Sequence, residues 1–322
     1  MKMKTLLKLA LTASTILIST LSYAGGTLVV SNQTGTIVID DNNDYDEIVI
    51  PAGKTLSANI HILAGRTADV LIRGQNRNTS IIAPNGLFGH ADADAKGTAA
   101  KKRSNIYSDC NCTVSISTLT SRNPEKYHIL GDTNNSVMLA DNINIHTRIG
   151  PTSDIHDYHT TDGFGGGIGS SISNSEIDTF DDSIKVYRQE MTVENVTIYH
   201  NQYGAPFQFG WGGFNYAKLI LKGNNTVIDN AANYRHGVFA WVSTNTTGLV
   251  RRVDYRGNFN HLVANGKDKS KLYTFGHLSN NALTINGATL NLFGSNCIAS
   301  TNSNTEFRLT SNAAITNGIY CQ

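Results

Sequence analysis

The sequence predicts an all-β fold, a right-handed parallel β-helix in which short strands stack coil upon coil. No stretch shows a sustained apolar spacing of three and four, so few helices are expected. From about Val70 onward, short apolar strands alternate with turns rich in Asn, Gly, Ser and Asp. These strands recur at intervals close to the length of one solenoid coil.

The recurring strands share one form, in which Asn or Gly stands shortly before an alternating apolar segment. They are DNINIHT (141–147), SNSEIDT (173–179), VENVTIY (193–199), GNNTVID (223–229), INGATLN (285–291) and SNAAITN (311–317). Aligning them on Ile145, Ile177, Ile198, Ile228, Leu290 and Ile315 gives steps of 32, 21, 30, 62 and 25 residues. Most steps have solenoid length, and the step of 62 is expected to contain a further unit through LVRRVDY at 249–255. A leucine-rich repeat is disfavoured because its leucine pattern and helical half are absent, and a β-sandwich is the alternative fold.

Residues 1–24, MKMKTLLKLALTASTILISTLSYA, are expected to be a secretory signal peptide that is cleaved after Ala24. A retained membrane anchor is the alternative, but the apolar run that follows Lys2, Lys4 and Lys8 is shorter than the roughly 20 residues a membrane-spanning helix needs. The sequence therefore predicts a secreted or periplasmic protein that does not stay in the membrane after cleavage. Removing these three lysines from 26 basic residues leaves 23 against 25 acidic ones, a formal net charge of −2 that does not indicate a nucleic-acid partner.

Residues 25–322 are expected to form a single β-helix domain, since no Pro- or Ser-rich linker divides them. The segment 25–50 contains TLVVSN and IVIDDNNDYDEIVI, which indicate opening coils or a small N-terminal cap. The segment 91–122 begins with ADADAKGTAAKKRS and breaks the rhythm, so it is expected to be an excursion from the coils. The sequence does not indicate an oligomeric state.

The four cysteines fit an oxidising compartment. Cys297 and Cys321 are expected to form a disulfide that pins the C-terminal end of the chain. Cys110 and Cys112 stand only two positions apart, which is tight for a disulfide, so they are expected to be inert or loosely paired thiols.

One Asp-Gly pair and one Asp-Asp pair stand nineteen positions apart in TDGFGGGIGSSISNSEIDTFDDSIKVY, at 161–187. Because nineteen positions is close to one coil, Asp162 is expected beside Asp181 and Asp182, on adjacent strands about 4.8 Å apart. Like charges at such a distance raise at least one pKa and leave a proton shared within the group, which is the state a general acid needs. A calcium site and solvated turn acids are the alternatives.

Residues that could bind a substrate follow the carboxylates. Ile184 and Val186 are expected to point into the coil, which directs Lys185 and Tyr187 outward beside the aspartates as sugar contacts. A solvated lysine and a packed tyrosine are the alternative interpretation.

A second set of candidate sugar contacts lies in QFGWGGF at 208–214, about one further coil along. Gln208 and Trp211 are expected to line the same cleft, where the indole face of Trp211 suits the apolar face of a glucose ring. His236 is a weaker candidate, since beside Arg235 it could equally belong to a surface pair.

Asp-Gly followed nineteen positions later by Asp-Asp, then IKVY, NVTIY and QFGWGG, resembles the catalytic region of glycoside hydrolase family 49, the dextranase and isopullulanase family. The resemblance covers roughly 141–241 and extends more loosely to the polygalacturonases. It implies a β-helix in which Asp181 is the general acid, while Asp162 and Asp182 hold and deprotonate the attacking water. It also implies inversion at the anomeric carbon, for which acid and base lie about 6.5–9.5 Å apart, a separation that carboxyls on neighbouring coils can reach.

The sequence therefore predicts an inverting glycoside hydrolase whose partner is a polysaccharide, an α-glucan such as dextran or pullulan. We expect no cofactor, and no metal because no complete ligand set is visible. A polygalacturonase-like hydrolase is one alternative, although the chain has TTDG at 160–163 and RHG at 235–237 where polygalacturonases usually show NTDG and GHG. A non-catalytic β-helix adhesin or glycan-binding protein is the alternative from a different class.

Overall fold

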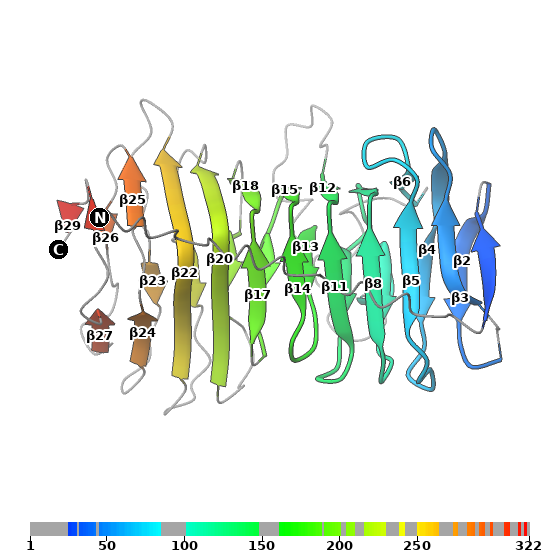
Figure 1. Cartoon of the computed structure of the whole chain (residues 1–322), viewed down its shortest axis with the longest axis horizontal. Coiled ribbons are helices and arrows are strands. Elements are labelled where there is room, and N and C mark those ends of the chain that lie inside the picture. Colours follow the sequence, from blue (N-terminus) through cyan, green and yellow to red (C-terminus); the bar gives the residue numbers. More distant parts are fainter. Residues whose placement is uncertain are drawn as a thin grey trace, which may run out of the picture.

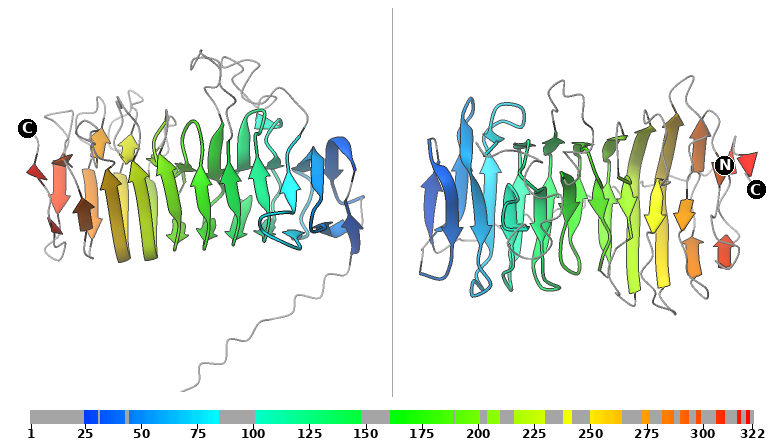
Figure 2. Two further views of the ribbon diagram at one scale, coloured as in Figure 1. Left: turned by 90° about the horizontal axis from the view of Figure 1, so that it is seen from above. Right: turned by 180° about the vertical axis from the view of Figure 1, so that it is seen from behind.

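The chain folds into a parallel β-helix, as the sequence predicts. The computed structural model describes residues 25–30, 32–42, 45–84, 101–147, 161–188, 190–200, 204–209, 216–229, 238–241 and 250–263, together with seven short strands between 273 and 320. The coils stack in one elongated column, which Figure 2 shows from two sides. No helix in this described part is long and apolar enough to cross a membrane.

Most coils contain three strands, and equivalent strands of successive coils pair in parallel to form three ladders. The first ladder contains β1 (Gly26–Val29), β3 (Tyr45–Ile50), β5 (Val70–Gly74), β8 (Thr113–Ser117), β11 (Val137–Asp141), β14 (Ser171–Ser173), β17 (Met191–Glu194), β24 (Ala282–Asn286) and β27 (Glu306–Leu309). The second contains β6 (Ile81–Ile82), β9 (Thr120–Arg122), β12 (Asn144–His146), β15 (Glu176–Asp178), β18 (Thr197–His200), β25 (Leu290–Phe293) and β28 (Ile315–Thr316). The long strands β20 (Tyr216–Asp229) and β22 (Val250–Val263) extend through both ladders (Figure 1).

The third ladder contains β2 (Thr34–Ile39), β4 (Thr55–Ile62), β7 (Ile106–Ser108), β10 (Tyr127–Gly131), β13 (Asp162–Gly165), β16 (Ile184–Lys185), β19 (Phe207–Gln208), β21 (Phe239–Trp241) and β23 (Tyr273–Phe275). Two further strands, β26 (Cys297–Ile298) and β29 (Ile319–Tyr320), pair with each other. Along each complete coil the chain passes from the first ladder to the second and then to the third. The turn from the second ladder to the third is therefore the same corner of the column in every coil.

The core is a stack of apolar side chains that point into the coils. In the second ladder Ile145 pairs with Ile177 and Ile177 pairs with Ile198, as the sequence alignment predicts, and all three are buried. At the next coil Ile198 pairs with Val227 rather than with Ile228. Because side chains alternate in direction along a strand, this one-residue difference places Val227 in the core.

The predicted extra unit between residues 228 and 290 is β22, which pairs with β20 on one side and with β24 and β25 on the other. Leu290 pairs with Ile315, as aligned. On its other side Leu290 pairs with Phe259 of β22, and Phe259 pairs with Asn225 of β20. The sequence alignment placed Leu290 in line with Ile228, which lies three positions after Asn225, so the alignment is wrong at this step.

The Asn residues that recur ahead of the second-ladder strands occupy left-handed turns. Asn142, Asn174 and Asn195 have φ angles of 52°, 49° and 55° at the bend between the first and second ladders, and Gly223 continues the row at 63°. Asn adopts this conformation more readily than most residues. Its amide also joins successive coils, since Asn195 Nδ2 donates to Asn174 Oδ1 at 3.2 Å. Turn geometry therefore explains the sequence pattern.

Residues 106–122 are part of the regular coils, so the prediction of an excursion over 91–122 is wrong for them. They form β7, β8 and β9, which pair in parallel with β4, β5 and β6. Val114 and Ile116 alternate inward within TVSIS, a pattern that the charged segment before it obscured. Residues 85–100 lie outside the described part. In the opening segment β1 pairs with β3 and β2 pairs with β4, so it forms an opening coil.

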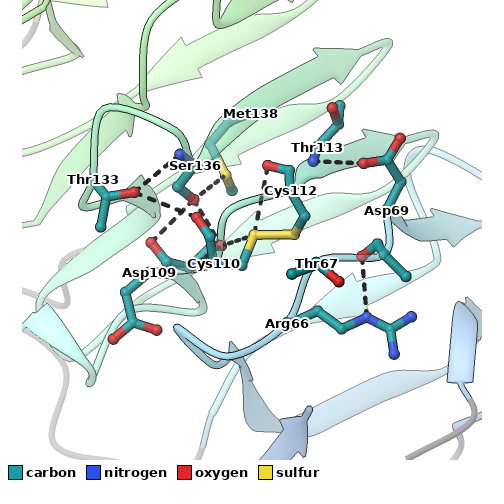
Figure 3. Close-up of a disulfide and its surroundings, with 12 residues drawn as sticks. Arg66, Thr67, Asp69, Asp109, Cys110, Cys112, Thr113, Thr133, Ser136 and Met138 are labelled. Carbon is teal, nitrogen blue, oxygen red and sulfur yellow. Dashed lines mark hydrogen bonds between the residues drawn. A yellow bond between two sulfur atoms is a disulfide. The ribbon is translucent and has the colours of Figure 1, made fainter. Parts of the chain in front are cut away.

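Cys110 and Cys112 form a disulfide with an S–S distance of 2.02 Å, which contradicts the prediction of inert or loosely paired thiols. They lie in the turn from β7 to β8, where the bend of the chain places their Cα atoms 5.3 Å apart, within the range that a disulfide spans. Figure 3 shows the bridge beside Thr133, whose hydroxyl donates to the Cys110 carbonyl at 3.4 Å. The predicted Cys297–Cys321 bridge involves side chains outside the described part.

Candidate active site

Three aspartates meet at the corner that leads into the third ladder. Asp162 begins β13, and Asp181 and Asp182 stand one coil later, in the turn from β15 to β16. One oxygen from each carboxyl lies within 4.8 Å of the others. The Asp182 N–H donates to Asp162 Oδ1 at 3.0 Å, so backbone pairing between the coils fixes the two residues together. The structure thus brings together the three residues that the coil spacing predicts to be neighbours.

Two glycines permit this close approach, and sequence reasoning missed their role. A Cβ on Gly163 would lie 2.2 Å from the Ser183 carbonyl oxygen. Gly204 has a φ of 78°, and a Cβ there would lie 2.2 Å from the Asp181 carbonyl carbon and 2.6 Å from Asp181 Oδ1. Any larger residue would displace the aspartate turn. Gly163 belongs to the Asp-Gly pair with Asp162, but the sequence offered no signal for Gly204.

Lys185 links two of the three carboxylates. Its Nζ lies 2.8 Å from Asp162 Oδ2 and 3.2 Å from Asp182 Oδ2, and it donates to Tyr187 Oη at 2.9 Å. Ile184 and Val186 are fully buried, as predicted, so the alternating strand turns Lys185 and Tyr187 toward the aspartates. Lys185 is itself only 8% exposed, which excludes the alternative of a solvated surface lysine.

The preceding coil supplies two residues that sequence reasoning missed. Tyr127 pairs with Asp162 across β10 and β13, and its ring lies 5.4 Å from Lys185 Nζ. Lys126 is buried, with Nζ 5.9 Å from the Tyr127 ring centre. Burial lowers the pKa of Lys126, while the charges of Asp162 and Asp181 oppose that shift. The site therefore contains a second buried cation.

The three carboxyls differ in their electrostatic environment. Burial raises the pKa of Asp181 well above its usual value, and the charges of Asp182 and Asp162 raise it further. Burial also raises the pKa of Asp162, to about 7, although Lys185 acts in the opposite direction. For Lys185, burial alone would lower the pKa, but Asp162 and its other neighbours raise it well above the usual value. A carboxyl with a strongly raised pKa beside two carboxyls that contact a cation is an arrangement that acid–base catalysis can use.

The three carboxylate oxygens are also close enough to hold a metal ion. Lys185 Nζ, however, already lies within 3.2 Å of oxygens from both Asp162 and Asp182. A divalent cation would have to displace this ammonium group, so the donor set fits a metal poorly.

The other predicted substrate contacts have different outcomes. Gln208 lies on β19 in the same ladder, but it is only 1% exposed, and its Nε2 is 3.5 Å from Asp182 Oδ1. Together with the Ala205 N–H, which donates to the same oxygen at 2.9 Å, it supports the carboxylate, and its burial argues against the predicted sugar contact. Trp211 and His236 lie outside the described part of the chain.

The three carboxyls lie close together. One oxygen of each carboxyl lies within 4.8 Å of the others, whereas the 6.5–9.5 Å of an inverting acid–base pair is the separation of whole carboxyl groups, so the predicted spacing stays a prediction. The direct hydrogen bond between the two coils holds Asp162 and Asp182 together, and it does not involve Asp181, the predicted acid.

Similarity to known proteins adds to this geometry. No protein-family model matches the chain. A dextranase of Arthrobacter sp. (strain CB-8) is 34% identical to it over 73 residues, which are 23% of this chain and 11% of that enzyme. The chain is similar to dextranases. This agrees with the family resemblance of the catalytic-region motifs.

Among solved structures, Dex49A from Penicillium minioluteum resembles this dextranase-like chain with a TM-score of 0.48 and 12% sequence identity. The similarity covers 88% of this chain and 64% of that one. The chain thus spans less than two thirds of either relative.

Proposed function

We propose that this protein is a glycoside hydrolase that cleaves α-glucosidic linkages in an α-glucan such as dextran or pullulan. The observation that carries the proposal is the cluster of Asp162, Asp181 and Asp182, in which one carboxyl has a strongly raised pKa and the other two contact Lys185. The sequence similarity to a dextranase supports the choice of substrate.

In the proposed reaction Asp181 gives its proton to the glycosidic oxygen as the bond from that oxygen to the anomeric carbon breaks. Asp162 and Asp182 hold a water molecule, and one of them takes its proton as the water oxygen bonds to the anomeric carbon. The sum is addition of one water across the bond. Lys185 places its ammonium group beside the two proposed bases and so stabilises negative charge on them.

A second mechanism is retention, because retaining enzymes place acid and nucleophile only about 5–5.5 Å apart and the carboxyls of this cluster also lie close together. In that mechanism Asp162 would attack the sugar directly. Both of its oxygens are already engaged, however, Oδ1 by the Asp182 N–H and Oδ2 by Lys185. A carboxylate held in this way is better suited to orient water than to form a covalent bond, so inversion remains the proposal.

A second candidate function is hydrolysis of a polyuronide, as in polygalacturonases. It is favoured by Lys126, a buried cation near Asp162 and Asp181 that an anionic sugar would neutralise. A non-catalytic glycan-binding protein is the candidate from a different class.

The experiment is a reducing-end assay of purified protein on dextran, pullulan and polygalacturonate, with Asp181→Asn as the inactive control. Release from dextran or pullulan by the wild type alone supports the proposal. Release from polygalacturonate alone would replace the α-glucan with a polyuronide. Binding without release from any polymer would favour the glycan-binding protein.

We also propose that the protein acts outside the cytoplasm after loss of residues 1–24, which the structure does not describe. The motivation is the basic and apolar pattern of that segment. Intact-mass measurement of exported protein should give a chain that begins at Gly25. A chain that keeps Met1 and remains in the cytoplasm would contradict this proposal.

A further inference from the structure

A cavity of about 410 Å³ lies on a different face of the column from the aspartates. It covers the second ladder, at β9, β12, β15 and β18, whereas the aspartates belong to the third. Its lining residues are Asn78, Thr120, Arg122, Asn144, Ile145, His146, Glu176, Asp178 and Tyr199. The volume falls within the range of ligand-binding pockets.

The cavity is built from two outward rows that repeat from coil to coil. One row pairs Thr120, Asn144 and Glu176. The other pairs Arg122 with His146, His146 with Asp178, and Asp178 with Tyr199. Between the rows, Ile145 and its equivalents are buried and form the floor. Polar groups therefore repeat along the column at the strand spacing of about 4.8 Å, which is comparable to the length of one pyranose unit.

The charges of the cavity are largely compensated. Arg77, which stands behind the lining, places Nη2 3.5 Å from Glu176 Oε1 and donates through Nε to Asn144 Oδ1 at 2.6 Å. His146 Nδ1 lies 3.8 Å from Asp178 Oδ2. A site with paired charges of both signs does not select a phosphate, a polyanion or a cation. Within the described residues, the only group of acids, histidines and cysteines close enough to hold a metal is the aspartate cluster.

Two groups of the cavity are suited to a polyhydroxyl ligand. Arg122 Nε is buried and has no hydrogen-bond partner among the described residues, so a ligand hydroxyl would satisfy a costly unpaired donor. Tyr199 is half-buried, and its outward ring offers an apolar face with a hydroxyl at its edge. The amides of Asn78 and Asn144 add both donors and acceptors.

We propose that this cavity is a second, non-catalytic binding site for a neutral glycan. It goes beyond the proposed hydrolysis, because binding here uses none of the three aspartates. The position suits such a role: Asp178 in the cavity precedes Asp181 by three residues, so the two sites share one corner of the column. A polymer held in the cavity would raise the local concentration of chain ends and segments at the aspartates.

The test is retention of the protein in native gels that contain dextran, pullulan or polygalacturonate, followed by titration calorimetry with the polymer that retains it. Tyr199→Ala should weaken binding to the neutral polymer about tenfold, and Tyr199→Phe should bind like the wild type because it keeps the ring. Tyr45→Ala is the matched control, since Tyr45 is a tyrosine 38% exposed on β3 of the first ladder. Thermal unfolding of each variant checks that it is folded.

Several outcomes would overturn the proposal. Equal retention of Tyr199→Ala and Tyr45→Ala would show that the cavity does not bind glycan. If gels that contain polygalacturonate retain the wild type, and Tyr199→Ala abolishes that retention, the ligand of the cavity is anionic. Hydrolysis of a short oligosaccharide should be unchanged in Tyr199→Ala, and a loss of kcat there equal to the loss of binding would place Tyr199 in the catalytic site. Because retention needs no turnover, this test separates the second site from failure of the proposed hydrolysis.

Discussion

Asp181 and Asp182 are neighbours in sequence with opposite surroundings. Asp182 Oδ1 accepts from the Ala205 N–H at 2.9 Å, and Oδ2 lies 3.2 Å from Lys185 Nζ, so both of its oxygens have partners. Burial raises the pKa of Asp181, and the charges of Asp182 and Asp162 raise it further. The proposed division into acid and base therefore rests on where the turn places each carboxyl.

Replacing Asp181 tests this division. Asp181→Asn keeps the shape of the side chain but removes its proton, and general acid catalysis is typically worth about 100- to 10,000-fold. We expect kcat to fall by a factor in that range while the polymer still binds, as measured by initial rates and calorimetry. Asp162→Asn and Asp182→Asn should also lower kcat severely. Near-normal turnover of Asp181→Asn would exclude it as the acid.

The same substitution should change stability in a pH-dependent way. The pKa of Asp181 is higher in the folded protein than its ordinary value of 3.8, so the folded state binds more protons above about pH 4. The unfolding free energy of the wild type therefore falls as pH rises above about 4. Asp181→Asn has no carboxyl at this position, so its unfolding free energy does not fall for this reason. Urea unfolding at pH 5 and pH 8 should show a variant that gains stability relative to the wild type at the higher pH. An unchanged difference between the two proteins would contradict the raised pKa.

Lys185 leads to a prediction about metals. Since its ammonium group supplies positive charge to Asp162 and Asp182, hydrolysis should survive EDTA. Lys185→Met should lower activity sharply, and added calcium should not restore it. Activity that EDTA removes and calcium restores would instead identify the aspartates as a cation site, especially if the products were unsaturated.

At the scale of elements, sequence reasoning found the strands but not every register. Ile145 and Ile177 aligned correctly because a short turn of constant form precedes each strand, whereas Ile228 was one position off because β20 runs through the bend without a break.

The acidic cluster was predictable because its two parts lie one coil apart. Tyr127 and Lys126 were not, since 35 residues separate Tyr127 from its partner Asp162 and no coil-length repeat joins them. The Cys110–Cys112 bridge depends on a local bend that the spacing alone does not reveal.

His128 in β10 leads to a test of how the coils hold together in acid. It is fully buried, and its ring nitrogens lie 2.9 Å from the hydroxyls of Ser121 and Thr147, which belong to neighbouring coils. Burial, with a smaller effect of His146, lowers its pKa to about 3. The unfolded chain therefore binds more protons between about pH 3 and 6.5, and stability is lost as pH falls through that window.

We expect the unfolding free energy to fall by about 2 kcal/mol between pH 7 and pH 4.5 because of His128. Urea unfolding of wild type and His128→Gln at both pH values isolates it, because the variant cannot take up that proton. The variant should lose about 2 kcal/mol less than the wild type over the interval, whatever its stability at pH 7. Parallel losses in the two proteins would show that His128 is not the sensitive group.

At the scale of the whole molecule, the site exists only because coils stack. Its residues come from four consecutive strands of the third ladder, with Tyr127 on β10, Asp162 on β13, Lys185 on β16 and Gln208 on β19. Each contributes one or two groups at a spacing fixed by backbone hydrogen bonds. The column therefore holds these groups in a rigid row, and the stereochemistry of the proposed reaction depends on where that row leaves room for water.

The anomeric configuration of the product decides between the two mechanisms that this row allows. If Asp162 and Asp182 hold the water, a single displacement inverts the anomeric carbon, although their oxygens lie within 4.8 Å of the acid. If Asp162 attacks the sugar, two displacements retain the configuration and leave a transient bond between sugar and Asp162. We expect inversion, because the Asp182 N–H and Lys185 already engage both oxygens of Asp162. Proton NMR of the first product released, before mutarotation, should show the inverted anomer, and a retained anomer would transfer the role of nucleophile to Asp162.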